Sequence, residues 1–249
     1  MDFSILHETT YDYADGVRES YSVVYLQPRT EPRQICSRYE LETNPPSRVF
    51  RYNDRFGNEV QHFTIIPKHS ELTIVSRSHV MTLDAEPPQA PVAALRSALA
   101  DDPAVEAFYE FTHESPSIVF GPRMRSLLTE IEMPGEAIGE WYVRAGEFVN
   151  ANFAYDTNAT TVFTEVDAAV AGRAGVCQDF AHVLVGLCRL AGIPARYVSG
   201  YIFAGKGRAL IGAEASHAWC EAYLPPYGWV GYDPTNRRLI DEHLSLIHI

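Results

Sequence analysis

The stretch Gly175-Val-Cys-Gln-Asp-Phe-Ala-His182 leads into an apolar segment that is closed by Gly192-Ile-Pro-Ala195. Glycine accepts a left-handed cap and proline cannot continue a helix, so we expect one helix from Cys177 to about Ala191. Cys177 would then lie in the first turn, where unpaired backbone N–H groups and the positive end of the helix dipole favour a thiolate. A lone cysteine is more often a buried structural residue, so other residues must decide its role.

Two runs after this helix could supply the partners of a reactive thiol. His217 lies in the alternating run Ser216–Tyr223, and Asp233 ends the run Gly228–Asp233. A histidine can take the proton of a thiol, and a carboxylate can fix the tautomer of that histidine and support its positive form. In a hairpin, the two side chains share a face only if the turn holds an odd number of residues or a strand is bulged. We therefore expect a turn of three or five residues, or a bulge.

The first third of the chain has a different pattern. From Phe3 to about Leu83, aromatic or β-branched residues alternate with polar ones. A period of two between turn residues predicts an antiparallel β domain over residues 1–85. Hairpin turns are expected at Asp15-Gly16, Asn44-Pro45-Pro46 and Asp54–Asn58.

A proline-rich segment, Asp84–Pro91, marks the expected end of this domain, because it cannot continue a central strand. Apolar residues then recur at helical spacing, so residues 86–135 are expected to form a linker and a helical segment. Residues 136–249 would form the catalytic core. The alternative that residues 244–249 are a truncation or a cloning artefact stays open.

The composition narrows the function classes. The chain has 249 residues, 46% of them hydrophobic, and a formal net charge of −12, which is typical of a globular protein and unfavourable for binding a phosphate backbone. No apolar run reaches the length of a membrane span, and the N-terminus has no signal-peptide pattern. Four cysteines without Cys-x-x-Cys spacing fit a reducing compartment better than a disulfide framework or a zinc site. These features predict a soluble, cytoplasmic protein that binds neither nucleic acid nor membrane.

Several ordered blocks closely resemble the core of bacterial transglutaminase-like proteins. They are Gly175–His182, Ala191–Tyr201, His217-Ala-Trp219 and Gly228–Asn236. Residues 1 to about 83 resemble the β-rich region that often precedes this core, including Leu26-Gln-Pro-Arg29 and Asp54–Asn58.

The resemblance implies an α+β protein whose N-terminal antiparallel β domain precedes a papain-like core, with a central helix packed on an antiparallel sheet. It also implies acyl transfer through a thioester on peptide or protein amides, with Cys177, His217 and Asp233 as catalytic residues. No cofactor or metal is implied. Family members include transglutaminases, peptidases, peptide amidases and proteins without known activity, so membership does not choose among them.

Three questions stay open at this level. The Cys177 backbone N–H should stabilise an oxyanion together with a second donor, for which Tyr155 and Trp219 are candidates, although both could simply pack in the core. A non-catalytic binding or scaffold protein with the same fold is an alternative. An arylamine-type acetyltransferase is a further alternative, but it would need an acyl-CoA pocket for which the sequence has no signature.

Overall fold

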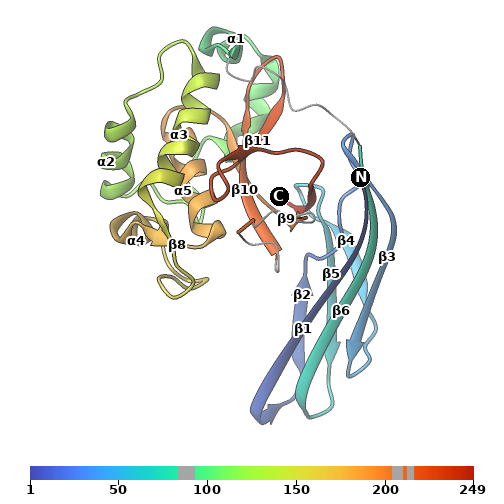
Figure 1. The fold of residues 1–249 in the computed structure, drawn as a ribbon. Helices are drawn as coiled ribbons and strands as arrows, with labels where there is room; N and C mark the ends of the chain where they lie inside the picture. Colours follow the sequence, from blue (N-terminus) through green and yellow to red (C-terminus); the bar gives the residue numbers. More distant parts are fainter. Residues whose placement is uncertain (84–92, 204–209, 212–215) are drawn as a thin grey trace. The chain divides into compact units, whose positions relative to one another are not determined.

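The computed structural model describes residues 1–83, 93–203, 210–211 and 216–249. Its contacts divide the chain into two compact units, Met1–Ala85 with Glu242–Ile249, and Glu86–Asp241 (Figure 1). Sheets dominate the first unit, and helices packed on a sheet form the second, so the expected α+β class is confirmed. The proline-rich segment expected between the two lies outside the described residues.

The first unit consists of two antiparallel sheets. Its strands are β1 (Asp2–Val17), β2 (Ser20–Val24), β3 (Gln34–Asn44), β4 (Phe50–Asn53), β5 (Glu59–Ile65) and β6 (His69–Thr82). One sheet has the order β1-β6-β3 and the other β2-β5-β4. Buried residues of β5 and β6, among them Phe63, Ile65, Leu72 and Ile74, form an apolar core shared by both sheets.

Only one of the three expected hairpin turns joins neighbouring strands. Asp54–Asn58 connects β4 to its partner β5, and the Asp54 carboxylate accepts hydrogen bonds of 2.9 Å from the N–H groups of Phe56 and Asn58. Asp15-Gly16 lies instead within β1, at an irregularity in its pairing with β6. Asn44-Pro45-Pro46 lies between β3 and β4, which belong to different sheets. Turn residues indicate where a chain bends but not which strand it will pair with.

The last residues of the chain belong to the first unit, a placement that the sequence did not anticipate. The buried Gln34 side chain donates to the carbonyl of Leu246 at 2.7 Å and accepts from its N–H at 2.8 Å. Asn58 makes the same pair of bonds with the backbone of Ile249, at 2.9 Å each. The side-chain amides of Gln34 and Asn58 thus bond backbone N–H and C=O groups in and next to strand β13 (Leu244–His248), as a neighbouring strand would.

The second unit begins with four helical segments, as the helical spacing predicted. They are α1 (Arg96–Ala100), the 3-10 helix η2 (Pro103–Phe111), α2 (Pro122–Ile131) and α3 (Ile138–Asn152). The remaining elements are β7 (Ala154–Tyr155), α4 (Val166–Gly172), β8 (Ala174–Gly175), α5 (Cys177–Leu190), β9 (Ala195–Ile202), β10 (Ser216–Tyr223), β11 (Trp229–Asp233) and β12 (Arg238–Leu239).

Helix α5 is the centre of this unit. Most of its residues are buried, among them Leu184, Val185 and Leu187. This is expected for a helix that is apolar around its circumference. The helices lie against one face of the sheet in which β12, β11, β10 and β9 follow one another (Figure 1). The hydroxyl of Tyr142 on α3 donates to the carbonyls of Cys220 and Val230 at 2.9 and 3.1 Å, which ties that helix to two strands.

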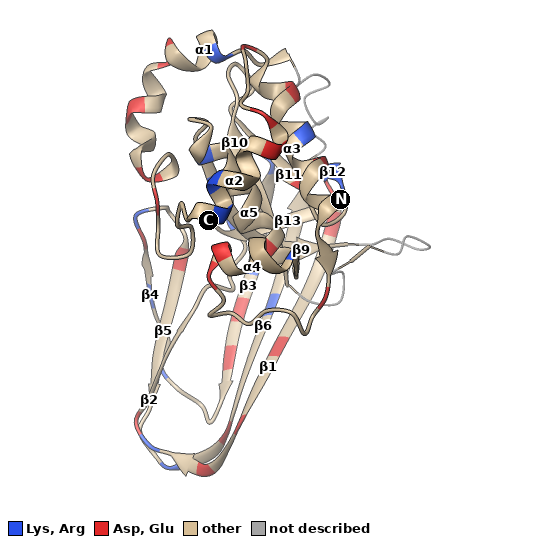
Figure 2. Ribbon diagram, turned by 90° about the vertical axis from the view of Figure 1, so that its left-hand side faces the viewer, with Lys and Arg blue, Asp and Glu red and all other residues tan. Residues whose placement is uncertain are grey.

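Charged residues are spread along the elements. Figure 2 shows Asp and Glu at intervals along β1 and β3, and the chain as a whole carries 32 acidic against 20 basic residues. None of the described helices has both the length and the hydropathy that a bilayer crossing needs.

Candidate active site

The helix that carries Cys177 begins where the sequence predicted. Cys177 is the first residue of α5 and is half-buried. The buried Asp179 carboxylate accepts the N–H of Val176 at 2.8 Å and the hydroxyl of Thr160 at 2.6 Å. A Cβ at Gly175 would lie 2.4 Å from the same carboxylate, so only glycine fits this close approach. These contacts fix the turn that presents the Cys177 sulfur and backbone N–H.

The hairpin after α5 satisfies the expected parity. Strands β10 and β11 pair in the register Tyr223↔Trp229 and Cys220↔Tyr232, which leaves five residues, 224–228, in the turn. Paired residue numbers thus have an even sum, and His217 and Asp233 lie on the same face. The prediction of an odd turn is confirmed.

His217 and Asp233 form a buried pair. Nε2 of His217 lies 2.8 Å from Oδ2 of Asp233, and both side chains are fully buried. The N–H groups of Thr235 and Asn236 and the Asn236 side-chain amide also donate to this carboxylate, at 2.9, 3.2 and 2.8 Å. A carboxylate held by four donors can fix the His217 tautomer with the proton on Nε2, so that Nδ1 is the free base.

The second nitrogen of His217 is left for the cysteine. Nδ1 is buried and has no formed hydrogen bond among the described residues. Burial alone would lower the pKa of His217, but its interactions with Asp233 and with the Cys177 thiol raise the pKa to about 9. Because Asp233 occupies Nε2, the thiol must act through Nδ1, across a contact looser than a regular hydrogen bond. Such contacts commonly tighten only when substrate binds.

The two candidates for a second oxyanion donor occupy different surroundings. Tyr155 pairs with Gly175 in the short parallel ladder of β7 and β8, and burial followed by the charge of Cys177 raises the pKa of its hydroxyl. Trp219 lies two residues after His217 on β10 and is buried, and its Nε1–H has no hydrogen-bond partner among the described residues. Tyr155 therefore lies in the electrostatic field of the thiol, whereas Trp219 offers an unused donor on the His217 face of the strand.

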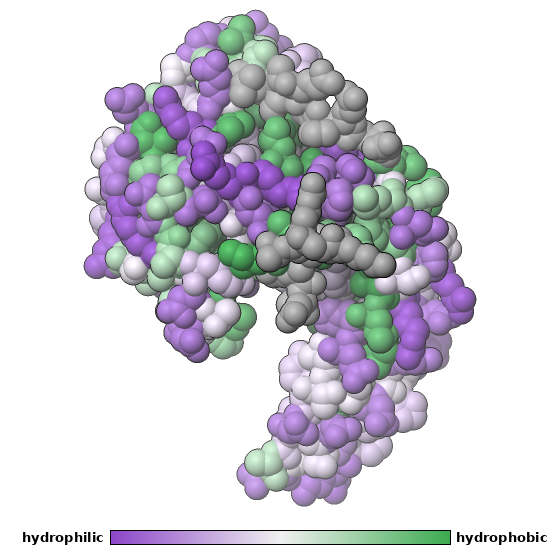
Figure 3. All heavy atoms as spheres, viewed as in Figure 1, coloured by the Kyte–Doolittle hydropathy of each residue, from purple (hydrophilic) through white to green (hydrophobic). Residues whose placement is uncertain are grey.

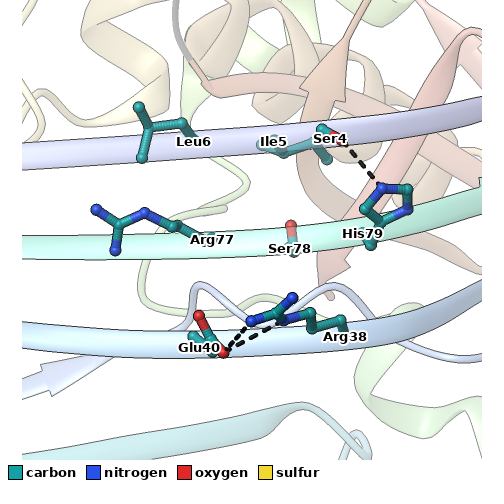
Figure 4. Close-up of a pocket in the computed structure, with 8 residues that line it drawn as sticks. All are labelled: Ser4, Ile5, Leu6, Arg38, Glu40, Arg77, Ser78 and His79. Atoms are coloured by element: carbon teal, nitrogen blue, oxygen red, sulfur yellow. Dashed lines mark hydrogen bonds and ion pairs between the residues drawn. The ribbon is translucent and has the colours of Figure 1, made fainter.

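A hollow of about 320 Å³ lies elsewhere, on the sheet β1-β6-β3 (Figure 4). Its lining includes Ser4, Leu6, Arg38, Glu40, Arg77 and His79. The guanidinium groups of Arg38 and Arg77 already pair with Glu40 and Glu42 at 2.6 Å, so no charge is left uncompensated for a ligand. The hollow contains none of the three predicted catalytic residues.

The chain matches two family models. Residues 3–81 match the bacterial transglutaminase-like N-terminal region, and residues 127–234 match the transglutaminase-like superfamily. An uncharacterised protein of Mycobacterium tuberculosis is 31% identical over 261 residues, covering 98% of this chain and 82% of the relative. The chain belongs to the transglutaminase-like superfamily.

Two further similarities concern this superfamily. A solved structure from Cytophaga hutchinsonii, provisionally named a cysteine protease, matches with a TM-score of 0.78 and 22% identity, covering all of this chain and 81% of that one. A protein-glutamine gamma-glutamyltransferase of Pseudomonas aeruginosa is 37% identical over 67 residues, which is 25% of this chain and 10% of the relative. The first supports the fold over the whole chain, and the second is confined to a short segment.

Within this transglutaminase-like fold, Cys177, His217 and Asp233 come together as the sequence analysis expected, and their catalytic roles stay predictions. The thiol also affects Tyr197 on β9, where burial and then the charge of Cys177 raise the pKa of the hydroxyl. Its ring lies 4.8 Å from that of His182, whose pKa burial lowers to about 4. His182 thus packs behind Tyr197 as a neutral residue.

Sequence reasoning assigned no role to Asn236, which holds the Asp233 carboxylate through two hydrogen bonds. The only signal was its place just after the strand end, within the block Gly228–Asn236. Asp179 lies in the first turn of α5, and its bonds to Val176 and Thr160 order the loop that precedes the helix.

Proposed function

We propose that this protein is a cysteine-dependent amide hydrolase or acyl transferase that acts through a thioester on peptide or protein amides. Cys177 is the nucleophile, His217 its general base and acid, and Asp233 the residue that orients the histidine. The observation that carries the proposal is the buried His217–Asp233 bond of 2.8 Å, which leaves Nδ1 of His217 unbonded, together with the effect of Cys177 on the pKa of that histidine.

In the first half-reaction the Cys177 sulfur attacks the carbonyl carbon of the amide. His217, protonated on Nδ1 after taking the thiol proton, gives that proton to the departing amine as the C–N bond breaks, and a thioester remains. In the second half-reaction water or a primary amine attacks the thioester, His217 removes its proton, and the Cys177 thiolate departs. Asp233 keeps Nε2 protonated and stabilises the imidazolium throughout.

The tetrahedral oxyanion would be held by the backbone N–H of Cys177 in the first turn of α5. The proposed second donor is either the hydroxyl of Tyr155 or the indole N–H of Trp219. The pKa effect of Cys177 on Tyr155 favours the former, and the unused buried N–H favours the latter. Thiol chemistry of this kind needs no metal or organic cofactor.

A second candidate function is a binding protein that keeps the fold without turnover. It differs from the enzyme in the reactivity of the Cys177 thiol, which can be measured. In an enzyme, His217, whose pKa is raised to about 9, takes the proton of the Cys177 thiol. In a scaffold the thiol has no need of a proton acceptor. Localisation in the cytoplasm and a peptide or protein substrate are further expectations that accompany the enzymatic proposal.

The decisive test is alkylation of the protein by iodoacetamide at pH 7, followed residue by residue with peptide mass spectrometry. Cys36 is the internal control, since burial raises the pKa of its thiol and its sulfur donates to the carbonyl of Arg38 at 3.4 Å. We expect Cys177 to react at least about tenfold faster than Cys36, and His217→Ala to remove this advantage. Equal rates at the two cysteines, unaffected by His217→Ala, would leave only the scaffold function.

If Cys177 proves reactive, the acceptor can be identified with a glutamine-rich protein such as casein. Ammonia release without incorporation of a fluorescent primary amine would indicate hydrolysis, and amine incorporation would indicate transfer. Both activities should disappear in Cys177→Ala.

A further inference from the structure

The loop between β7 and α4 is hydrogen-bonded to one residue before Cys177 and to one residue after it. At its start, the N–H of Asp156 donates to the carbonyl of Gly175 at 2.9 Å, two residues before Cys177. In its middle, the hydroxyl of Thr160 donates at 2.6 Å to Asp179, two residues after Cys177. The loop therefore runs alongside the first turn of α5.

Directly after Thr160 the chain makes a tight turn that is stabilised by its own hydrogen bonds. Backbone N–H of Thr164 donates to the carbonyl of Thr161 at 2.9 Å, and N–H of Thr161 donates to the Thr164 hydroxyl at 2.9 Å. The Thr161 hydroxyl also accepts the N–H of Phe163 at 3.3 Å. A turn with this many internal bonds holds the two residues at its corner in a fixed position.

Those two corner residues are apolar and face solvent. The exposed fractions of Val162 and Phe163 are 73% and 91%, and Phe163 is the most exposed large apolar residue of the described chain. Single exposed apolar residues are common on protein surfaces, and on the face drawn in Figure 3 the apolar residues form separate patches among polar ones. Val162 and Phe163 differ from such scattered residues. They are adjacent at the corner of an ordered turn, and their loop is bonded on both sides of Cys177.

The covalent chain limits how far this corner can lie from the site. Phe163 lies three positions after Thr160, so their Cα atoms are at most about 11 Å apart, and the turn shortens this span. Thr160 itself is hydrogen-bonded to the residue that caps the Cys177 helix. Three positions of chain and the hydrogen bonds of Asp179 thus tie the corner to the turn that presents Cys177.

We propose that Val162 and Phe163 form an apolar subsite that receives an aromatic or large aliphatic side chain of the acyl donor. This inference rests on the proposed function and adds a substrate class to it, namely peptide amides with an apolar residue at the acyl side of the bond. Thr161–Thr164 offers threonine hydroxyls and methyl groups, and the exposed Glu165 that follows would repel an acidic side chain. Apolar surface that is exposed in the free protein becomes buried when such a side chain binds.

The test compares two thiol-directed probes that differ only in one side chain, the chloromethyl ketones of N-acetylphenylalanine and N-acetylglycine. Each alkylates Cys177 by loss of chloride, and the ratio of their second-order rates measures recognition of the benzyl group without any need for turnover. In the wild-type protein we expect the phenylalanine probe to react faster. Phe163→Ala should reduce the ratio about two- to twelvefold, the range of a single aromatic pair.

Met133→Ala is the matched control, since Met133 is also an exposed apolar residue of the same unit. Its loop contacts Arg96, which also bonds the carbonyl of Ala191 just beyond the far end of α5. Helix α5 has 14 residues, so this control lies about 20 Å from Cys177 along the helix. The ratio of the two probes should not change in this variant.

Two negative outcomes are distinguishable. Rapid labelling of Cys177 by the glycine probe, with a phenylalanine-to-glycine ratio that Phe163→Ala does not alter, would overturn the subsite and leave the proposed thiol chemistry intact. Failure of both probes to label Cys177 faster than Cys36 would overturn the proposed function and the subsite with it. Because Phe163 is almost fully exposed, its replacement by alanine should not affect folding.

Discussion

Asp179 joins a loop, a turn and a helix through a single carboxylate. It accepts hydrogen bonds from Val176 and Thr160 at 2.8 and 2.6 Å while it is itself 5% exposed. A buried donor that loses its partner costs more than the bond contributes when formed. The position of the Cys177 N–H, and with it the proposed oxyanion site, should therefore depend on this residue.

We expect Asp179→Ala to lower the free energy of unfolding by about 1–3 kcal/mol, because the Val176 N–H is left buried without an acceptor. It should also slow alkylation of Cys177 by the N-acetylglycine chloromethyl ketone. Asp179→Asn keeps an oxygen that can accept from Val176 and should retain most of both properties. Urea denaturation and the labelling rate check this. If the two variants lose labelling equally, the negative charge and not the geometry is what matters.

The residues of the candidate site differ in how well a sequence can identify them. Cys177 and Asp233 each stand at the end of an element, where proline, glycine and periodicity mark the boundary. His217 lies near the start of an alternating run. Tyr197 and Asn236 carry no such mark. Their contacts with the site depend on the tertiary neighbours of β9 and on the turn after β11, which local patterns do not specify.

Helix α3 approaches β11 closely enough that one side chain would separate them. A Cβ at Gly146 would lie 2.3 Å from Cε1 of Tyr232, whose ring packs edge-on against Tyr142 at 6.0 Å between centroids. Tyr232 immediately precedes Asp233, so this contact also supports the strand end that carries the candidate orienting residue. Packing at this density responds to the addition of even one methyl group.

Gly146→Ala should lower the free energy of unfolding by about 1–3 kcal/mol, since a rigid ring and a helix backbone must move apart. Gly172→Ala is the control in another helix, where the added methyl group would meet nothing within 4 Å. That variant should be neutral or more stable, because alanine favours a helix over glycine. Equal unfolding midpoints in urea for wild type and Gly146→Ala would show that the helix can shift at no cost.

At the level of elements, periodicity was a better guide than turn chemistry. The odd turn between β10 and β11 followed from the requirement that His217 and Asp233 share a face, and the register has five residues there. In the first unit, by contrast, two of the three expected hairpins were wrong. The chain there passes between two sheets, and a glycine or proline pair is compatible with either path.

At the scale of the whole molecule, the two units can be observed separately. All three tryptophans, Trp141, Trp219 and Trp229, belong to the unit Glu86–Asp241, so tryptophan fluorescence follows the unfolding of that unit alone. The sequence could not indicate that Glu242–Ile249 belongs to the other unit. That assignment depends on Gln34 and Asn58, which are more than 190 positions away along the chain.

The buried His217–Asp233 pair links the stability of the second unit to pH. The pKa of His217 is about 9 in the folded protein and about 6.5 in an unfolded chain. A raised pKa means that the folded state holds a proton that the unfolded state has released. The stabilisation is therefore fully present below about pH 6.5, declines as pH rises, and is lost above about pH 9.

His217→Gln should consequently be less destabilising at high pH than at low pH. Relative to this variant, the wild-type protein should lose about 3 kcal/mol of its free energy of unfolding between pH 6 and pH 10. Urea titrations of both proteins, followed by tryptophan fluorescence at several pH values, measure the difference directly. Groups that titrate alike in both proteins cancel in this comparison. A wild-type advantage that stays constant, or grows, across this range would mean that His217 is neutral beside Asp233, and the ion-pair account of the site would have to be abandoned.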